Sequence, residues 1–434
     1  MTAIRPPSAP ALAAACREAA ERSLARLEAR PGRPAGLKPF YAWLRQGAAT
    51  AEAGGAPLVG QVCNFLPEEL ALAAGVRPVR LEVGCQAAVE AAGSEVSPDG
   101  VCCAVRALLG GLGTGPLGFT RLDLVVVPAA CDGKRKLAGL LARRSGMEVV
   151  ALELPRRKRD PASAERFVEE LRALLARLER LGGRRAGRRE LAAAIALIQR
   201  RAAAFRGLQD LRRAARPPLG AAELFAVAQS AFLADTAGWV AQAEALLAEL
   251  RAGPPPSGPP PVRLLLTGAP VLWPDFELLL AAEEAGADFV ADDLCSGSER
   301  LAHPPVVDEP TRDGLLRAAA ERVLQPCTCP CFAEHEDRPR RVLELARQSG
   351  AQGVVHHTLR GCALFELERA ELLAGLQLHG LPSLSLTAEF GLQEGGMLRN
   401  RLDAFVEVVR GLAGSSSLVL KAKRIPSSER SEPG

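Results

Sequence analysis

The chain has 434 residues, 48% of them hydrophobic and 24% charged, so it is long enough for two or three domains and too long for one small core. Its 54 basic and 50 acidic side chains leave a formal net charge of only +4, so neither nucleic acid nor an anionic membrane is an expected partner. No apolar run reaches the roughly 20 residues of a membrane span, and the N-terminus lacks a secretory pattern. We therefore expect a cytoplasmic protein.

The first part of the chain changes its pattern three times. Residues 1–55 predict a helical N-terminal arm, with helices over 11–28 and 40–46. Between 56 and 160, short apolar runs alternate with helical stretches, which is typical of a parallel sheet covered by helices and indicates a first α/β domain. Residues 161–251 contain three long amphipathic segments and no convincing strand, and they predict a helical segment.

A proline-rich run marks the clearest boundary in the sequence. Residues 252–261 hold six prolines and favour an extended polyproline II linker. After it the strand–helix alternation resumes and predicts a second α/β domain over 262–414, followed by a flexible tail over 415–434. The expected fold class is α/β, with two parallel-sheet domains, a helical N-terminal arm and a helical insert.

The most informative residues are the eleven cysteines, because a reducing compartment keeps thiols for packing, metal binding or chemistry. Four of them come just after expected strands: Cys63, Cys131, Cys295 and Cys362. The carboxyl edge of an open parallel sheet is where ligands bind, so thiols from distant positions can converge there. Scattered thiolates with few histidines suit soft metals and iron–sulfur clusters above all, although zinc remains an alternative.

The other cysteines fall into three groups. Cys102 and Cys103 begin a predicted helix, where the unpaired N–H groups and the helix dipole favour a thiolate. The cysteines Cys327, Cys329 and Cys331 are close together, but their spacing is neither that of a zinc ribbon nor that of a ferredoxin, so their role stays open. Cys16 and Cys85 are expected to pack.

Eight short motifs, taken in order between residues 56 and 412, resemble the 2-hydroxyacyl-CoA dehydratase D-component family, which also includes benzoyl-CoA reductase subunits. They are residues 60–75, 102–106, 130–136 (Ala-Cys-Asp-Gly-Lys-Arg-Lys), 265–270, 291–300, 353–362, 398–401 and 404–407. The resemblance implies two flavodoxin-like domains and a four-iron four-sulfur (4Fe-4S) cluster held between them. Its implied ligands are Cys102, Cys131 and Cys362, with Cys63 and Cys103 in reserve.

The resemblance also implies an activity. A partner ATPase passes one low-potential electron through the cluster to the thioester carbonyl of an acyl-CoA substrate, and the ketyl radical so formed expels the 2-hydroxyl group. The protein would then be an anaerobic, radical-using lyase, or a related ATP-dependent reductase, that works as a homo- or heterodimer of homologous chains. No catalytic side chain follows from the sequence. Two alternatives stay open: a double-cubane-cluster reductase of small substrates, and a non-catalytic partner subunit.

Overall fold

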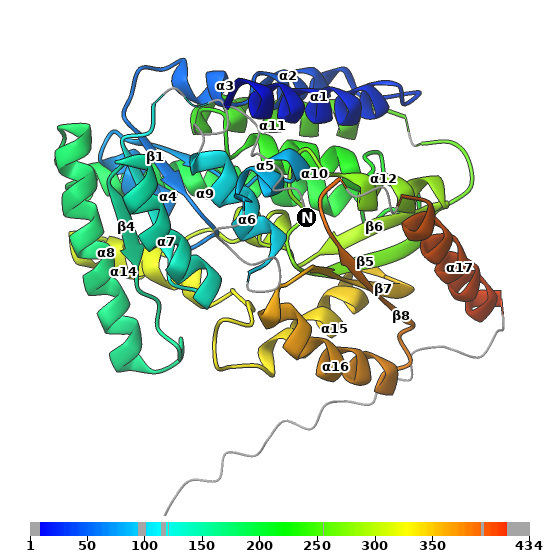
Figure 1. Cartoon of the computed structure of the whole chain (residues 1–434). Coiled ribbons are helices and arrows are strands. Elements are labelled where there is room, and N and C mark those ends of the chain that lie inside the picture. Colours follow the sequence, from blue (N-terminus) through cyan, green and yellow to red (C-terminus); the bar gives the residue numbers. More distant parts are fainter. Residues whose placement is uncertain are drawn as a thin grey trace, which may run out of the picture.

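The computed structural model describes residues 9–93, 101–113, 119, 121–254, 256–391 and 395–414. Two four-stranded sheets, both entirely parallel, lie at the centre of its two halves (Figure 1). Parallel neighbours need long crossover connections, and helices supply them here. The expected α/β class with two parallel sheets and an N-terminal helix is confirmed. The expected tail, 415–434, lies outside the described residues.

The first sheet has the strand order β2-β1-β3-β4. Its strands are β1 (Leu58–Gln61), β2 (Arg77–Arg80), β3 (Leu124–Pro128) and β4 (Val149–Leu152), and α4 (Glu68–Ala73), α5 (Gln86–Ala91), α6 (Cys103–Gly113) and α7 (Asp132–Ser145) connect or follow them. Every residue of β1 and β3 is buried, because helices cover both faces of a parallel sheet. Pro78 is tolerated in β2, since an edge strand does not need all of its N–H groups.

The second sheet repeats this arrangement with the order β6-β5-β7-β8. Its strands are β5 (Val262–Gly268), β6 (Ala287–Asp292), β7 (Gly353–Leu359) and β8 (Ser383–Ala388). Its helices are α12 (Glu277–Glu284), α13 (Ser298–Ala302), α14 (Arg312–Leu324), α15 (Asp337–Ser349), α16 (Ala363–Leu378) and α17 (Gly395–Gly414). Counted within each sheet, both orders read 2-1-3-4, which is the flavodoxin-like winding.

The remaining helices surround the two sheets. The arm consists of α1 (Ala9–Glu28), α2 (Lys38–Gln46) and α3 (Ala48–Glu52), with α1 and α2 near α11 (Thr236–Ala252) (Figure 1). Leu24, Leu27 and Phe40 of the arm share one apolar core with residues of α11 and of α10 (Ala221–Ser230). The segment between the sheets forms α8 (Pro161–Gly182), α9 (Arg188–Leu211), α10 (Ala221–Ser230) and α11 (Thr236–Ala252). The third predicted helix of this segment is therefore two helices. Asp235 caps the second of them by accepting a hydrogen bond from the Gly238 N–H.

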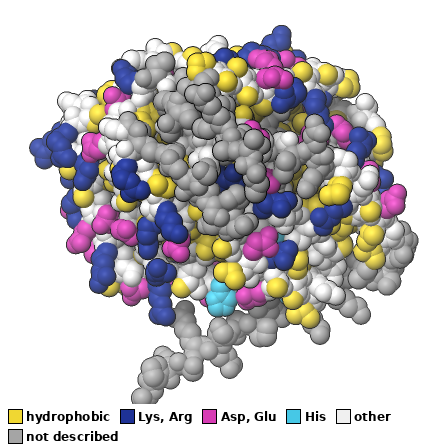
Figure 2. Space-filling model, in the orientation of Figure 1, with side chains coloured by type: hydrophobic (Ala, Val, Ile, Leu, Met, Phe, Trp, Pro, Cys, Tyr) yellow, Lys and Arg dark blue, Asp and Glu magenta, His cyan; other side chains and the backbone are white. Residues whose placement is uncertain are grey.

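One helix of the second half packs against the first half. Leu315, Ala319 and Val323 of α14 lie in the same apolar cluster as Val59 of β1 and Leu171 of α8. The chain that follows α14 therefore runs beside the first sheet. Figure 2 shows basic and acidic side chains interspersed on the visible face, as the small net charge indicates. Among the described residues, no helix is both long and apolar enough to cross a membrane.

Candidate functional site

Each sheet has a point where its strand order reverses, between β1 and β3 in the first and between β5 and β7 in the second. In this fold, ligands bind beyond the carboxyl ends of the strands at that point. Cys63 follows β1, Cys131 follows β3 and Cys362 follows β7. The structure thus places one thiol of the second half and two of the first at the positions where the topology favours a ligand.

The three cysteines predicted as ligands share one local setting, because each begins a helix. The first intrahelical bonds run from Arg106 N to the Cys102 carbonyl (3.1 Å), from Arg135 N to the Cys131 carbonyl (2.9 Å) and from Glu366 N to the Cys362 carbonyl (3.1 Å). All three thiols are partly exposed. The free N–H groups and the dipole at the start of α6, α7 and α16 place a partial positive charge beside each of these cysteines.

Cys102 and Cys362 are in contact, although 259 positions separate them (362 − 102 − 1). Their thiols form a hydrogen bond. The backbone supports the contact, since Cys103 N donates to the Arg360 carbonyl at 3.2 Å. At Gly361, with φ +79°, a Cβ would lie only 3.0 Å from the Val101 carbonyl oxygen. Glycine therefore allows the two halves to approach closely here.

This contact changes the chemistry of the pair. The hydrogen bond from Cys362 outweighs burial and lowers the pKa of Cys102 to about 6. The same hydrogen bond, together with burial, raises the pKa of Cys362. N–H groups of Val105 and Ala104 also favour the Cys102 thiolate. Within the pair, the thiolate form is therefore favoured on Cys102 and disfavoured on Cys362.

Lys134, one turn into α7, connects Cys131 with the other thiols. Its Nζ donates a hydrogen bond to the Sγ of Cys63. Burial by itself lowers the pKa of Lys134, but Cys63, Glu82 and Cys131 outweigh it and raise that pKa well above its ordinary value. The same ammonium group helps to lower the pKa values of Cys102 and Cys362. Cys131 and the Cys102–Cys362 pair thus face one lysine.

The two reserve cysteines differ. Cys63 is buried against Lys134 and adopts φ +62°, a left-handed conformation that is uncommon for a residue other than glycine. The thiol of Cys103 instead lies in an apolar cluster with Leu359 and Phe390. Burial there raises the pKa of Cys103 to about 12, which favours its protonated form among these apolar side chains.

A second group of thiols, from residues 295–331, lies against Lys134 and Cys63, and its position there is not predicted by the sequence. Cys329 and Cys331 share a hydrogen bond, Cys331 faces Cys63, and Cys329 faces Lys134. Cys327 hydrogen-bonds to Glu299, and the Sγ of Cys295 is 3.8 Å from a guanidinium nitrogen of Arg80. Leaving out Cys16, Cys85 and Cys103, the other eight of the eleven cysteines thus belong to one connected network.

Two carboxyl groups beside this network titrate near neutrality. Burial raises the pKa of Glu299 to about 7, against the hydrogen bond from Cys327, and burial raises the pKa of Glu368 to about 8, against the charge of Arg338. Such groups can exchange protons at physiological pH. Within the described ranges, no three His, Cys, Asp or Glu side chains are gathered closely enough to hold a single metal ion.

A cavity of about 920 Å³ opens at the carboxyl edge of the second sheet. Its wall consists of α1, the start of α5, the loop after β5, the ends of β7 and β8, and the start of α17. Leu359 and Phe390 line it and also pack with Cys103 and Cys362. One apolar layer therefore separates this cavity from the Cys102–Cys362 pair, and the cavity is of the size that takes a drug-sized molecule.

His357 gives this cavity a polar contact. The side chain is 4% exposed and lines the cavity, and its Nδ1 lies 3.1 Å from the Ala269 carbonyl oxygen. A carbonyl only accepts, so Nδ1 carries the proton and Nε2 carries a lone pair. Burial lowers the pKa of His357, which keeps the ring neutral. In the described part of the chain, Nε2 has no hydrogen-bond partner.

Comparison with known proteins identifies the family. The family model described as "2-hydroxyglutaryl-CoA dehydratase, D-component" matches residues 63–409. The Escherichia coli (strain K12) protein "Putative dehydratase subunit YjiM" is 27% identical over 360 residues, which cover 82% of this chain and 92% of that protein. "(R)-2-hydroxyglutaryl-CoA dehydratase, subunit beta" of Acidaminococcus fermentans is 24% identical over 367 residues, which cover 83% and 94%. The chain therefore belongs to the 2-hydroxyglutaryl-CoA dehydratase D-component family.

Proposed function

We propose that this chain is an iron–sulfur subunit of the 2-hydroxyacyl-CoA dehydratase type, with a 4Fe-4S cluster held by Cys102, Cys131 and Cys362. The observation that carries the proposal is that thiols from both α/β halves begin three helices and face one lysine. Thiolates are the ligands that iron–sulfur clusters take. A four-iron cluster is larger than a single ion, so ligands spaced more widely than those of an ion site suit it.

The side chains around the thiols would bind the cluster, balance its charge and exclude water. When bound, the cluster would supply a low-potential electron and, with three protein ligands, one open iron that acts as a Lewis acid. The starts of α6, α7 and α16 hold Cys102, Cys131 and Cys362 in place, and an iron–sulfur cluster would bind each of them as a thiolate. Lys134 offsets part of their negative charge, and Leu359 and Phe390 keep water from the side facing the cavity.

The substrate in this proposal is an acyl-CoA whose acyl end enters the cavity at the second sheet. The cavity adjoins the thiol pair, and its lining combines apolar side chains with charged ones and with His357 as a buried acceptor. A 2-hydroxyl group can donate to Nε2 of His357, whereas an acyl chain without that hydroxyl leaves Nε2 unpaired, at a cost of about 1–3 kcal/mol. The reaction is then loss of water from a 2-hydroxyacyl thioester, or reduction of a related thioester.

The proposal includes two protein partners. The chain has no P-loop sequence, so an ATP-dependent activator must deliver the electron. The family model names a component, and one relative is named as a beta subunit, which supports a second, homologous chain as the other partner. We place the complex in the cytoplasm.

A second candidate is a double-cubane-cluster reductase of small substrates. The network of eight thiols favours it, because Cys295, Cys327, Cys329 and Cys331 exceed what three ligands require. Cys63 lies between the two groups, in contact with Lys134 and facing Cys331. The network could hold a second cubane beside the first.

Metal analysis of anaerobically purified protein tests these alternatives. Four irons and four sulfides per chain support the dehydratase type, eight of each support the double cubane, and a protein without iron contradicts both. Cys131→Ala is expected to lose cluster, whereas the control Cys103→Ala is expected to keep it. Full cluster content in Cys131→Ala contradicts the ligand assignment. Turnover of a 2-hydroxyacyl-CoA with an ATPase activator then separates an enzyme from a non-catalytic subunit.

A further inference from the structure

Two cysteines outside the thiol network face each other across the interface between the arm and the first sheet's helices. The Sγ of Cys16 on α1 lies 2.9 Å from the Sγ of Cys85, which precedes α5. Cys16 is partly exposed and Cys85 is 5% exposed. Cys16 also lies outside the residues matched by the family model, whereas Cys85 lies inside them. The contact thus joins a segment outside the matched residues to the matched part of the fold.

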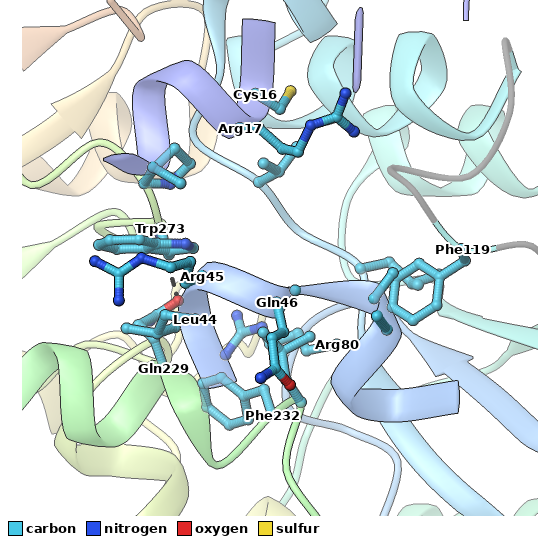
Figure 3. Close-up of a pocket in the computed structure, with 18 of the residues that line it drawn as sticks. Cys16, Arg17, Leu44, Arg45, Gln46, Arg80, Phe119, Gln229, Phe232 and Trp273 are labelled. Atoms are coloured by element: carbon cyan, nitrogen blue, oxygen red, sulfur yellow. Dashed lines mark hydrogen bonds between the residues drawn. The ribbon is translucent and has the colours of Figure 1, made fainter. Parts of the chain in front are cut away.

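The pair lies between two cavities. Cys16 lines a cavity of about 300 Å³, which Arg17, Trp273 and Phe119 also line (Figure 3). Cys85 lines the larger cavity of about 920 Å³ at the second sheet. Helix α1 contributes to both walls, so each of the two thiols borders a cavity.

We propose that Cys16 and Cys85 form a reversible disulfide that fixes α1 over the larger cavity, with a low-molecular-weight disulfide such as oxidised glutathione as the oxidant. The Cys85 thiolate attacks one sulfur of that disulfide, whose S–S bond breaks, and a first glutathione thiolate leaves. The Cys16 thiolate then attacks Cys85 in the mixed disulfide and releases the second. Two protein thiols are oxidised, one glutathione disulfide is reduced to two thiols, and the two protons pass to the released thiolates.

The geometry favours this exchange. The two sulfur atoms have to approach by only about 0.9 Å to reach the length of a disulfide bond. Cys85 is suited to be the attacking group, because the hydrogen bond from Cys16 outweighs burial and lowers its pKa to about 7. The N–H groups of Ala88 and Ala87 act in the same direction. A thiol with a pKa near ambient pH is the best attacking group.

The cross-link would add a covalent bond to a cavity wall that noncovalent contacts hold in place. Helix α1 contributes six residues to the larger cavity: Ala15, Glu18, Ala19, Arg22, Ser23 and Arg26. Helix α1 is held on the second sheet's side by Leu24 and Leu27, which are buried in one core with Phe276 and Leu279. A hydrogen bond from Ser23 Oγ to the Pro274 carbonyl (2.7 Å) and ion pairs of Arg26 with Glu277 and Glu284 add to this packing. These contacts lie in the C-terminal half of the helix, so the disulfide would add a covalent tie nearer its N-terminus.

Oxidation of the full-length, cluster-loaded chain with oxidised glutathione under argon tests the proposal. Peptide mass spectrometry without reductant is expected to find one peptide pair that joins residues 16 and 85, lost on addition of dithiothreitol. In Cys16→Ser, Cys85 should stop at the mixed disulfide and carry one glutathione. Cys103→Ser, which removes a buried neighbouring thiol, should oxidise like the wild type.

A glutamate-specific protease provides a second measurement, because Glu28 ends α1, is exposed and is followed by alanine. After cleavage there, the N-terminal fragment should stay attached in non-reducing gels of the oxidised protein and separate in Cys16→Ser. The proposal is wrong if oxidised glutathione yields no joined peptide while iodoacetamide labels both thiols, or if Cys85 pairs with Cys103. Neither result changes the iron content, so failure here is distinct from failure of the proposed function.

Discussion

The ion pair between Glu69 and Arg322 offers the sharpest test of how the two halves are held together. Glu69 belongs to the first turn of α4, shortly after Cys63, and Arg322 is near the end of α14, shortly before Cys327. The guanidinium group makes two hydrogen bonds, from Nε to Oε1 (2.9 Å) and from a terminal nitrogen to Oε2 (2.6 Å). The side chains are 0% and 2% exposed. The ion pair therefore joins the segment that precedes Cys327 to the segment that follows Cys63.

Replacing Arg322 with methionine leaves the Glu69 carboxylate buried without its partner. Removing one member of a buried pair costs about 3–5 kcal/mol of unfolding free energy, because the remaining charge keeps its desolvation penalty. The double variant Glu69→Gln/Arg322→Met avoids that penalty and should recover most of the loss. Arg322 also helps to lower the pKa of Glu68, so the recovery will be incomplete.

Urea unfolding of the four proteins in a double-mutant cycle measures the effect, since the cycle isolates the pair. Arg317→Met is the matched control on the same helix, because Arg317 pairs with Glu165 at the surface and its loss should leave the stability nearly unchanged. The reasoning is refuted if Arg322→Met is as stable as Arg317→Met, or if the double variant is less stable than the single one.

Three further predictions concern pH, packing and the cavity. Nearby arginines outweigh burial and hold the pKa of Glu68 well below its ordinary value. The ionised carboxylate therefore stabilises the fold above about pH 4.5, and this stabilisation is lost as the pH falls towards the folded-state pKa. Glu68→Gln should flatten that part of an acid-unfolding curve. Gly110→Ala should cost about 1–3 kcal/mol in urea unfolding, because its Cβ would lie 2.0 Å from the Ala88 carbonyl oxygen, whereas Gly139→Ala should not destabilise. His357→Phe should reduce the preference for 2-hydroxyhexanoyl-CoA over hexanoyl-CoA about tenfold in calorimetric titrations, and equal affinities in the wild type would contradict its role.

The sheet architecture follows largely from the sequence, because buried parallel strands are short apolar runs between helices. The strand β4 is the exception, because its four residues, Val-Val-Ala-Leu, are apolar but were not predicted as a strand; they lie partly exposed at the edge of the sheet. Helix α14 was not expected either. Its apolar residues serve the core of the first half, so no local pattern shows where it packs.

In the candidate site, the sequence likewise predicts the positions of some thiols, whereas the positions of others depend on tertiary packing. Strand order alone places Cys131 and Cys362 at the carboxyl edges, and the start of a helix accounts for Cys102. The position of Cys327, Cys329 and Cys331 beside Lys134 could not be predicted, because it depends on how α14 packs against the first half. The expectation that Cys16 and Cys85 pack was consistent with the structure, but only tertiary structure shows that they pack against each other.

The positive charge of Lys134 should influence the midpoint potential of the proposed cluster. The thiolates and the proposed cluster are negative, and this partly buried ammonium group is the cation that touches Cys63 and influences both Cys102 and Cys362. Reduction adds one more negative charge, so a nearby cation favours the reduced form. Lys134→Met should therefore make the midpoint potential more negative, by about 60 mV if the coupling is about 1.4 kcal/mol. Protein-film voltammetry measures this shift, and Lys136→Met, at an exposed position of the same helix, should show none. An unchanged potential in Lys134→Met with full iron content would mean that the cluster is bound away from this lysine.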